Sequence, residues 1–197
     1  MSAEEVVPEN NEGTQTNTES SVELSSEAEA KRFFKETRQR LLNINGWHQY
    51  AGSATAEFQL TDNDGKAITR LPQKGDHLKI DIPGPGTATG EGHDWVQVEA
   101  IEEDEDSIGI RVRPVSNPTN NRKDIAHFFS EDATSTFIVK REGKKITAAV
   151  YGRNEKPNTN TETLKDKLRN AAIATGAISG FSKLQWKSLV NGLIKKE

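Results

Sequence analysis

Hydrophobic and polar positions alternate along much of the chain between residues 55 and 152, which is the period of a β-strand. The strongest turn signal is Asp64–Gly65, and a second hairpin is centred on Glu142–Gly143. Strands joined mostly by short turns form an antiparallel sheet. The alternation predicts seven strands, at 55–60, 66–70, 77–82, 95–101, 107–115 and on both sides of the turn in 135–152.

Apolar positions recur with helical spacing at both ends of this region. Residues 26–44 are predicted to form a helix that begins at a capping box of Ser26 and Glu29. Residues 161–194 are predicted to form a long broken helix, with Leu164 and Leu168 on an apolar face of its first part. A sheet with one apolar face needs a cover. The predicted fold class is therefore α+β, a curved antiparallel sheet covered by the C-terminal helix, with one N-terminal helix.

Residues 1–25 contain mostly Glu, Ser, Thr and Asn and no aromatic side chain. Such a segment buries too little apolar surface to offset the entropy lost on ordering. The hydrophobic fraction of the whole chain is only 32%, and its mean hydropathy is -0.76. We therefore predict a disordered acidic tail over residues 1–25 and a single α+β domain over residues 26–197.

The net charge of -4 conceals large differences between segments. Residues 1–30 carry -8, residues 31–43 carry +4, residues 44–139 carry -8 and residues 140–197 carry +8. One interpretation is that acidic strands and basic helices neutralise one another. The other is a basic surface for an acidic protein or a nucleic acid. The residues that would form that surface are Lys140, Arg141, Lys144, Lys145 and Arg153.

The chain contains no cysteine, which excludes disulfides and thiolate sites. Its first residues lack the basic and apolar regions of a secretory signal, and no apolar run is long enough to span a bilayer. These features predict a cytoplasmic protein without a membrane span.

The glycine-rich stretch 82–95, IPGPGTATGEGHDW, lies between two predicted strands. Phosphate-binding loops precede a helix or carry a lysine, and this one has neither. Two interpretations remain: a long hairpin connection, or a loop that lies over the mouth of a cavity. In the second case Gly84, Gly86, His93 and Trp95 contribute to ligand binding.

Segment 116–133 is long for a strand connection and contains Phe128 and Phe129. The two rings either fill the core or contact a ligand beneath a mobile lid. No nucleophile motif, catalytic pair or metal-ligand spacing occurs in the sequence. We therefore predict no catalytic residue, no metal and no cofactor, and we favour a protein that is not an enzyme.

The stretches GDHLKIDIPGPG, HDWVQVEAIEED and ATSTFIVKREGKKITAAVYGRNEKPN, followed by a closing helix, resemble START-like (SRPBCC, helix-grip) domains. The resemblance covers about residues 74–195 and rests on element order and hydrophobic rhythm. The helix pair that such domains usually have between their first two strands is replaced here by a turn at residues 61–66. The resemblance implies an apolar cavity between the sheet and the last helix, holding a lipid-like or aromatic ligand.

Three function hypotheses follow from these observations. The first is a non-catalytic binding domain for a small apolar ligand in that cavity. The second is an interaction or scaffold protein that uses its acidic tail and basic C-terminal third to bind a protein or a nucleic acid. The third is an enzyme, because a fold does not fix a function.

Overall fold

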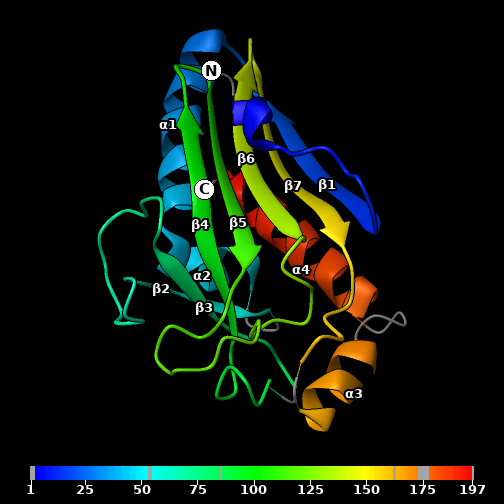
Figure 1. Ribbon diagram of the computed structural model, residues 1–197. Helices are drawn as coiled ribbons and strands as arrows, with labels where there is room; N and C mark the ends of the chain where they lie inside the picture. Colours follow the sequence, from blue (N-terminus) through cyan, green and yellow to red (C-terminus); the bar gives the residue numbers. More distant parts are fainter. Residues whose placement is uncertain (1–2, 53–54, 85, 162, 173–177, 197) are drawn as a thin grey trace.

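The strands form one open antiparallel sheet that runs through the whole molecule. The computed structural model describes the chain except residues 1–2, 53–54, 85, 162, 173–177 and 197. Seven strands lie in the described part, in the order β1-β7-β6-β5-β4-β3-β2 (Figure 1). They are β1 (Thr14–Glu23), β2 (Glu57–Thr61), β3 (His77–Asp81), β4 (Asp94–Glu103), β5 (Ser107–Pro114), β6 (Thr134–Glu142) and β7 (Lys145–Glu155). The predicted α+β class is confirmed.

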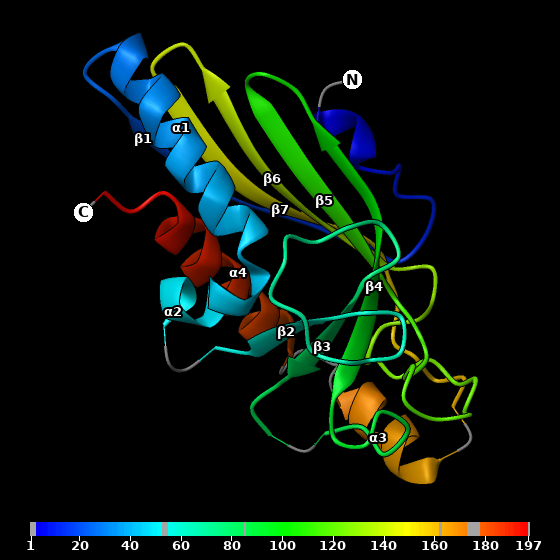
Figure 2. The same cartoon turned by 90° about the vertical axis from the view of Figure 1, so that its left-hand side faces the viewer.

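The helices divide between the two faces and one end of the sheet. They are η1 (Ala3–Val6), α1 (Glu27–Leu42), η2 (Ile44–Gly46), α2 (Trp47–Ala51), α3 (Leu164–Ala172) and α4 (Ile178–Leu193). Figure 2 shows α1, α2 and α4 on one face, η1 on the other, and α3 at the end where β4 begins. The predicted C-terminal helix is therefore two separate helices, of which α4 covers the sheet.

The core lies between the sheet and the helices α1, α2 and α4. Trp47 is fully buried at its centre, with its ring centroid 5.2 Å from that of Phe58 and 4.6 Å from that of Phe137. Its indole nitrogen donates to the Leu41 carbonyl oxygen at 2.9 Å, so burial leaves no polar group of the ring unpaired. The large apolar side chains on the helix-covered face of the strands pack around this tryptophan.

Strand β1 differs from the expected disordered tail over residues 1–25. It pairs with β7 in antiparallel register from Thr16↔Gly152 to Val22↔Ile146. Its outer edge is tied to α4, because Ser20 Oγ donates to Asn191 Oδ1 at 2.6 Å and Lys187 Nζ donates to the Glu19 carbonyl oxygen at 2.8 Å. Backbone pairing and these polar contacts order a segment that has few apolar side chains.

The second predicted strand, residues 66–70, is not a strand. Asp62 Oδ1 accepts hydrogen bonds from the backbone nitrogens of Asp64 and Lys66, and Gly65 has a φ of 76°, so the predicted turn does form. After the turn, only an isolated bridge joins Ala67 to Thr61. The strand number is seven because β1 takes the place of this segment.

The prediction that a turn at residues 61–66 replaces the helix pair between the first two strands is wrong, because β1 precedes these helices in the chain. With residues 14–23 as the first strand, α1 and α2 both lie between β1 and β2. The first strand and the last, β1 and β7, are neighbours in the sheet, and α4 packs against both. The chain therefore has a helix-grip-like arrangement.

The N-terminal segment crosses the face of the sheet opposite to α4. A Cβ at Gly109 in β5 would lie 2.9 Å from both the Ala3 carbonyl oxygen and Val6 Cγ2. Arg111 Nη1 donates to the Val6 carbonyl oxygen at 3.0 Å, and Asn154 Oδ1 accepts from the Asn11 backbone nitrogen at 2.8 Å. A residue without a side chain at position 109 thus allows the segment to contact the strand.

We expect Gly109→Ala to lower the free energy of unfolding by about 1–3 kcal/mol, the usual cost of overpacking. The added methyl group would displace the segment at Ala3 and Val6, and hydrogen exchange of its backbone amides should become faster. Gly180→Ala in α4 is the matched control, because the space around that position is open. Equal stabilities of the two variants would mean that the N-terminal segment does not pack on β5 in solution.

Candidate functional site

A small apolar recess lies where the predicted cavity was expected, between the sheet and the last helix. Its volume is about 40 Å³, far below the roughly 300–1,000 Å³ of typical ligand cavities. Larger hollows of about 320 to 490 Å³ are lined mostly by polar and charged side chains. The recess is lined by Ala56, Phe58, Ile80, Ile82, His127, Phe128, Ser182, Gln185 and Trp186.

Aromatic contacts hold the apolar wall that α4 contributes. The Trp186 ring lies 5.2 Å from that of Phe137 in an edge-on contact and 6.1 Å from that of Phe58. Phe58 is buried and alternates with Gln59 along β2, so it faces the helices. The recess is thus bounded by packed rings.

Gln185 brings an unpaired polar atom to this apolar wall. Gln185 is only 4% exposed, and its Oε1 accepts a hydrogen bond from the Ala56 backbone nitrogen at 2.7 Å. Its Nε2 is buried and has no hydrogen-bond partner in the described part of the chain. A buried unsatisfied donor costs about 1–3 kcal/mol, so such an atom points to a missing acceptor.

His127 contributes a second donor from the opposite wall. Its Nδ1 accepts a hydrogen bond from the Phe129 backbone nitrogen at 2.9 Å, which places the proton of the neutral ring on Nε2. Burial, together with the nearby Arg169 guanidinium, lowers the pKa of His127 to about 3. The ring therefore stays neutral at physiological pH.

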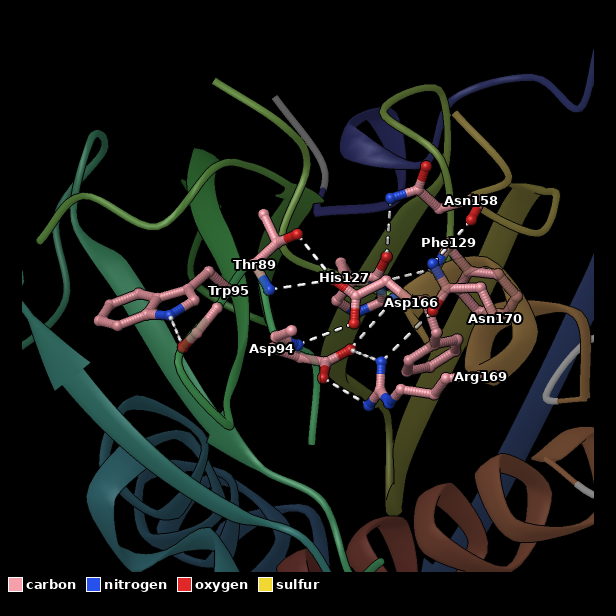
Figure 3. Close-up of polar contacts among 12 residues, drawn as sticks. Thr89, Asp94, Trp95, His127, Phe129, Asn158, Asp166, Arg169 and Asn170 are labelled. Carbon is pink, nitrogen blue, oxygen red and sulfur yellow. Dashed lines mark hydrogen bonds and ion pairs between the residues drawn. The ribbon is translucent and has the colours of Figure 1, made fainter. Parts of the chain in front are cut away.

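A buried ion pair supports the loop that carries His127 and Phe128. Arg169 Nη2 lies 2.7 Å from Asp94 Oδ1, and both side chains are almost completely buried (Figure 3). Asp94 Oδ2 also accepts from the Phe128 backbone nitrogen at 3.1 Å. Burial raises the pKa of Asp94 to about 6, although the Arg169 charge opposes this shift. The pair joins α3, the start of β4 and the recess-lining loop.

Asparagine side chains complete this support, as Figure 3 shows. Asn158 Nδ2 donates to the carbonyl oxygens of Ile125 and His127, at 2.9 and 3.0 Å. Asn170 Nδ2 in turn donates to the Asn158 carbonyl oxygen at 2.6 Å. The backbone around His127 is therefore fixed from the side of α3.

The glycine-rich loop binds a carboxylate of its own chain. Asp166 accepts hydrogen bonds from the backbone nitrogens of Ala88 and Thr89, at 2.7 and 2.9 Å, and from the Thr89 and Thr163 hydroxyls at 2.7 Å. Burial raises the pKa of Asp166, but these hydrogen bonds outweigh it and lower the pKa to about 2. The loop therefore docks α3.

Of the six residues predicted to bind a ligand, only Phe128 lines the recess. Gly84 is exposed, and Gly86 packs closely against Gly92. His93 lines a separate polar hollow with His48 and Glu57. The remaining two, Trp95 and Phe129, belong to other surroundings.

Trp95 is buried on the opposite side of β4 from Val96, which belongs to the helix-covered core. Its indole nitrogen donates to the Gly90 carbonyl oxygen at 3.4 Å. Phe129 is half-buried beside Phe128, with 4.5 Å between ring centroids, and forms a bridge to Pro157. Both residues stabilise the loops around the start of β4.

Two of the five residues of the predicted basic surface form ion pairs in the described part of the chain. Lys140 Nζ lies 2.7 Å from Glu4 Oε1, and Arg141 forms an ion pair with Asp106. Arg153 Nη1 donates to the Thr16 carbonyl oxygen at 3.0 Å. The two remaining residues, Lys144 and Lys145, are exposed at the β6–β7 turn.

Sequence reasoning did not identify Gln185, Arg169 or Asp166. The predicted apolar face of the α3 helix is reversed, because Leu168 is 64% exposed while Asp166, Arg169 and Asn170 are buried. The latter three have the i, i+3, i+4 spacing of one helix face, which is a signal that the sequence does contain. In the described residues, no group of three His, Asp or Glu side chains could hold a metal, and no helix is both long and apolar enough to cross a membrane.

Comparison with known proteins relates the chain to others through its fold. No protein-family model and no curated protein matches it. A hypothetical protein from Helicobacter pylori has a similar solved structure, with 11% identity, a TM-score of 0.54 and coverage of 92% of this chain and 86% of that one.

Two further solved structures are more distantly similar. The XoxI protein of Bacillus cereus has 13% identity and a TM-score of 0.46, and covers 93% of this chain and 97% of its own. The major latex-like protein 151 of Panax ginseng has 13% identity and a TM-score of 0.41, with 85% and 97% covered. The likeness to the Helicobacter pylori protein shows a shared fold.

Proposed function

We propose that the protein is a non-catalytic binding domain that holds a small, mainly apolar ligand in the recess between β2, β3 and α4. The observation that carries the proposal is the unpaired, buried Gln185 Nε2 in a recess that is lined mostly by apolar side chains. Burial of apolar surface supplies the affinity, and the polar atom supplies orientation.

The size of the recess limits the ligand. A volume of about 40 Å³ accommodates a group little larger than a water molecule, or one end of a longer molecule. A six-atom ring requires a modest outward movement of a lining side chain, because a cavity that binds benzene measures about 150 Å³. A complete lipid chain requires that Trp186 or a neighbouring side chain move outward. The proposed site lies where the START-like resemblance implied a cavity, between the sheet and the last helix. The proposed ligand is smaller than the one which that resemblance implied.

The test is a titration of the ¹⁵N-labelled protein with methylenecyclopentane, followed by amide NMR. We expect saturable shifts at Ala56, Phe128 and Trp186, because a ring in the recess contacts these residues. Ser182→Leu places a larger side chain in the recess and should weaken binding by about tenfold or more, equivalent to roughly 1.4 kcal/mol.

Leu184→Ala is the matched control, since Leu184 lies on the same helix and is 70% exposed. This variant should bind the hydrocarbon as the native chain does. Shifts that do not saturate, or that persist unchanged in Ser182→Leu, would show that the recess is not a binding site.

A further inference from the structure

Two polar side chains of the recess, Gln185 and His127, have a common chemical character. Gln185 Oε1 is already occupied by the Ala56 backbone nitrogen, at 2.7 Å. That contact fixes the orientation of the amide, because only the oxygen can accept from an N–H group. The remaining Gln185 atom, Nε2, is therefore a donor with no acceptor in the described residues.

The same reasoning applies to His127 in the opposite wall. Its Nδ1 accepts from the Phe129 backbone nitrogen, so the neutral ring presents Nε2–H as its remaining polar group. Gln185 and His127 thus each use their acceptor atom on the backbone and have a donor left. Ser182, the other polar residue of the recess, can either donate or accept.

The walls disfavour a charged ligand. Phe58, Ile80 and Phe128 are apolar, and the nearby charges of Asp94 and Arg169 are joined in an ion pair. A carboxylate or an ammonium group would lose its hydration there without meeting an unpaired opposite charge in the recess.

We infer that the recess selects an uncharged carbonyl compound with an apolar body, whose oxygen accepts hydrogen bonds from Gln185 Nε2 and His127 Nε2. This inference rests on the proposed binding function and adds the chemical class of the ligand. Ketones, aldehydes and amides belong to that class. A hydrocarbon of the same shape leaves the Gln185 Nε2 donor unpaired, so its affinity is lower.

The experiment compares cyclopentanone with methylenecyclopentane, which has the same shape but a CH₂ group in place of the oxygen. We expect the ketone to bind roughly tenfold more tightly, the effect of one or two neutral hydrogen bonds. The ketone should also move the Gln185 side-chain NH₂ resonances downfield, and the hydrocarbon should not.

Gln185→Glu is the diagnostic variant. Glutamate keeps an acceptor for the Ala56 backbone nitrogen and, when it is ionised, has no donor, so the preference for the ketone should be lost at a pH at which the carboxyl group is ionised. Amide NMR of the unliganded variant checks that the fold is unchanged. Gln185→Met, which is uncharged, provides a second variant in which the two probes should bind alike.

The outcomes separate the two proposals. Equal binding of both probes to the native chain, without a shift at the Gln185 NH₂ group, would overturn the selectivity and leave a purely apolar site. A water molecule that stays next to Gln185 at saturating ketone, seen by water–amide cross-relaxation, would also overturn it. If neither probe binds, the binding function itself fails.

Discussion

Exchanging Arg169 for methionine is expected to lower the free energy of unfolding by about 3–5 kcal/mol, which is the usual cost of breaking a buried ion pair. Asp94 is 1% exposed, and apart from Arg169 its carboxylate accepts a hydrogen bond from the Phe128 backbone nitrogen at 3.1 Å. A carboxylate left in this position is stabilised by neither water nor a counter-charge. Chemical denaturation at neutral pH measures the loss.

The uncompensated Asp94 charge, and not the missing arginine side chain, should account for most of this loss. The double variant Asp94→Asn with Arg169→Met contains no buried charge at this position, so it should be clearly more stable than Arg169→Met alone. Hydrogen exchange should show α3 protected again in the double variant, because Asp166 still accepts from Ala88 and Thr89.

Arg38→Met is the matched control, since Arg38 forms an ion pair with Glu103 at a more exposed position. Such pairs contribute about 0–1 kcal/mol. If Arg169→Met costs no more than Arg38→Met, the buried pair holds neither α3 nor the recess-lining loop in place.

The positions of these residues show which features the sequence predicts. Strands β3 to β7 follow from alternation, because one face of each is buried and the other is less so. Strand β1 does not, since Thr, Asn, Ser and Glu occupy both of its faces, and its order depends on pairing with β7, more than 120 residues away. Local composition contains no information about such a partner.

Helix α3 shows a second limit. A helix that packs on a hydrophobic core buries its leucines, and on this rule Leu168 is predicted to face inward. The surface beneath α3 is instead polar, made of loop N–H groups, the Asp94 carboxylate and the Asn158 carbonyl oxygen. The side of α3 that is buried is therefore the one that can form hydrogen bonds, which no hydrophobic pattern reveals.

The recess agrees with the predicted position of the cavity only at the level of elements. The expected position between the sheet and the last helix follows from the layer arrangement, and the recess lies there. Gln185 follows Ser182 in the spacing of a capping box, a pattern that predicts a helix start and gives no sign of a binding site. Its importance depends on the Ala56 backbone nitrogen, which belongs to the far edge of the sheet and is known only from the structure.

The pH dependence of stability is expected to carry a clear contribution from His127. Its pKa is about 3 in the folded chain against an ordinary value of 6.5. Between these values the unfolded chain binds a proton that the folded chain does not, so acidification favours unfolding by about 1.4 kcal/mol per pH unit. This stability is present above pH 6.5 and is lost as the pH falls towards 3.

Other buried groups act in the opposite direction. The pKa of Asp94 is raised to about 6 and that of Glu155 to about 7, in each case first by burial. Stability from these two groups is present at low pH and is lost as the pH rises through the folded values. The profile of the native chain is thus a sum of opposing effects, and the contribution of His127 must be measured as a difference between two chains.

His127→Gln is the variant for this measurement, since glutamine can still accept from the Phe129 backbone nitrogen but binds no proton. The native chain should be more stable than the variant at pH 8, and this difference in the free energy of unfolding should be smaller by about 2–3 kcal/mol at pH 4.5. The reason is that acidification destabilises only the chain that contains the buried neutral histidine. Asp94, Arg169 and Glu155 are present in both chains and cancel. Parallel profiles of the two chains, or an imidazole that titrates near pH 6.5 by NMR, would show that His127 is not held neutral and that its Nε2–H is not a fixed donor in the recess.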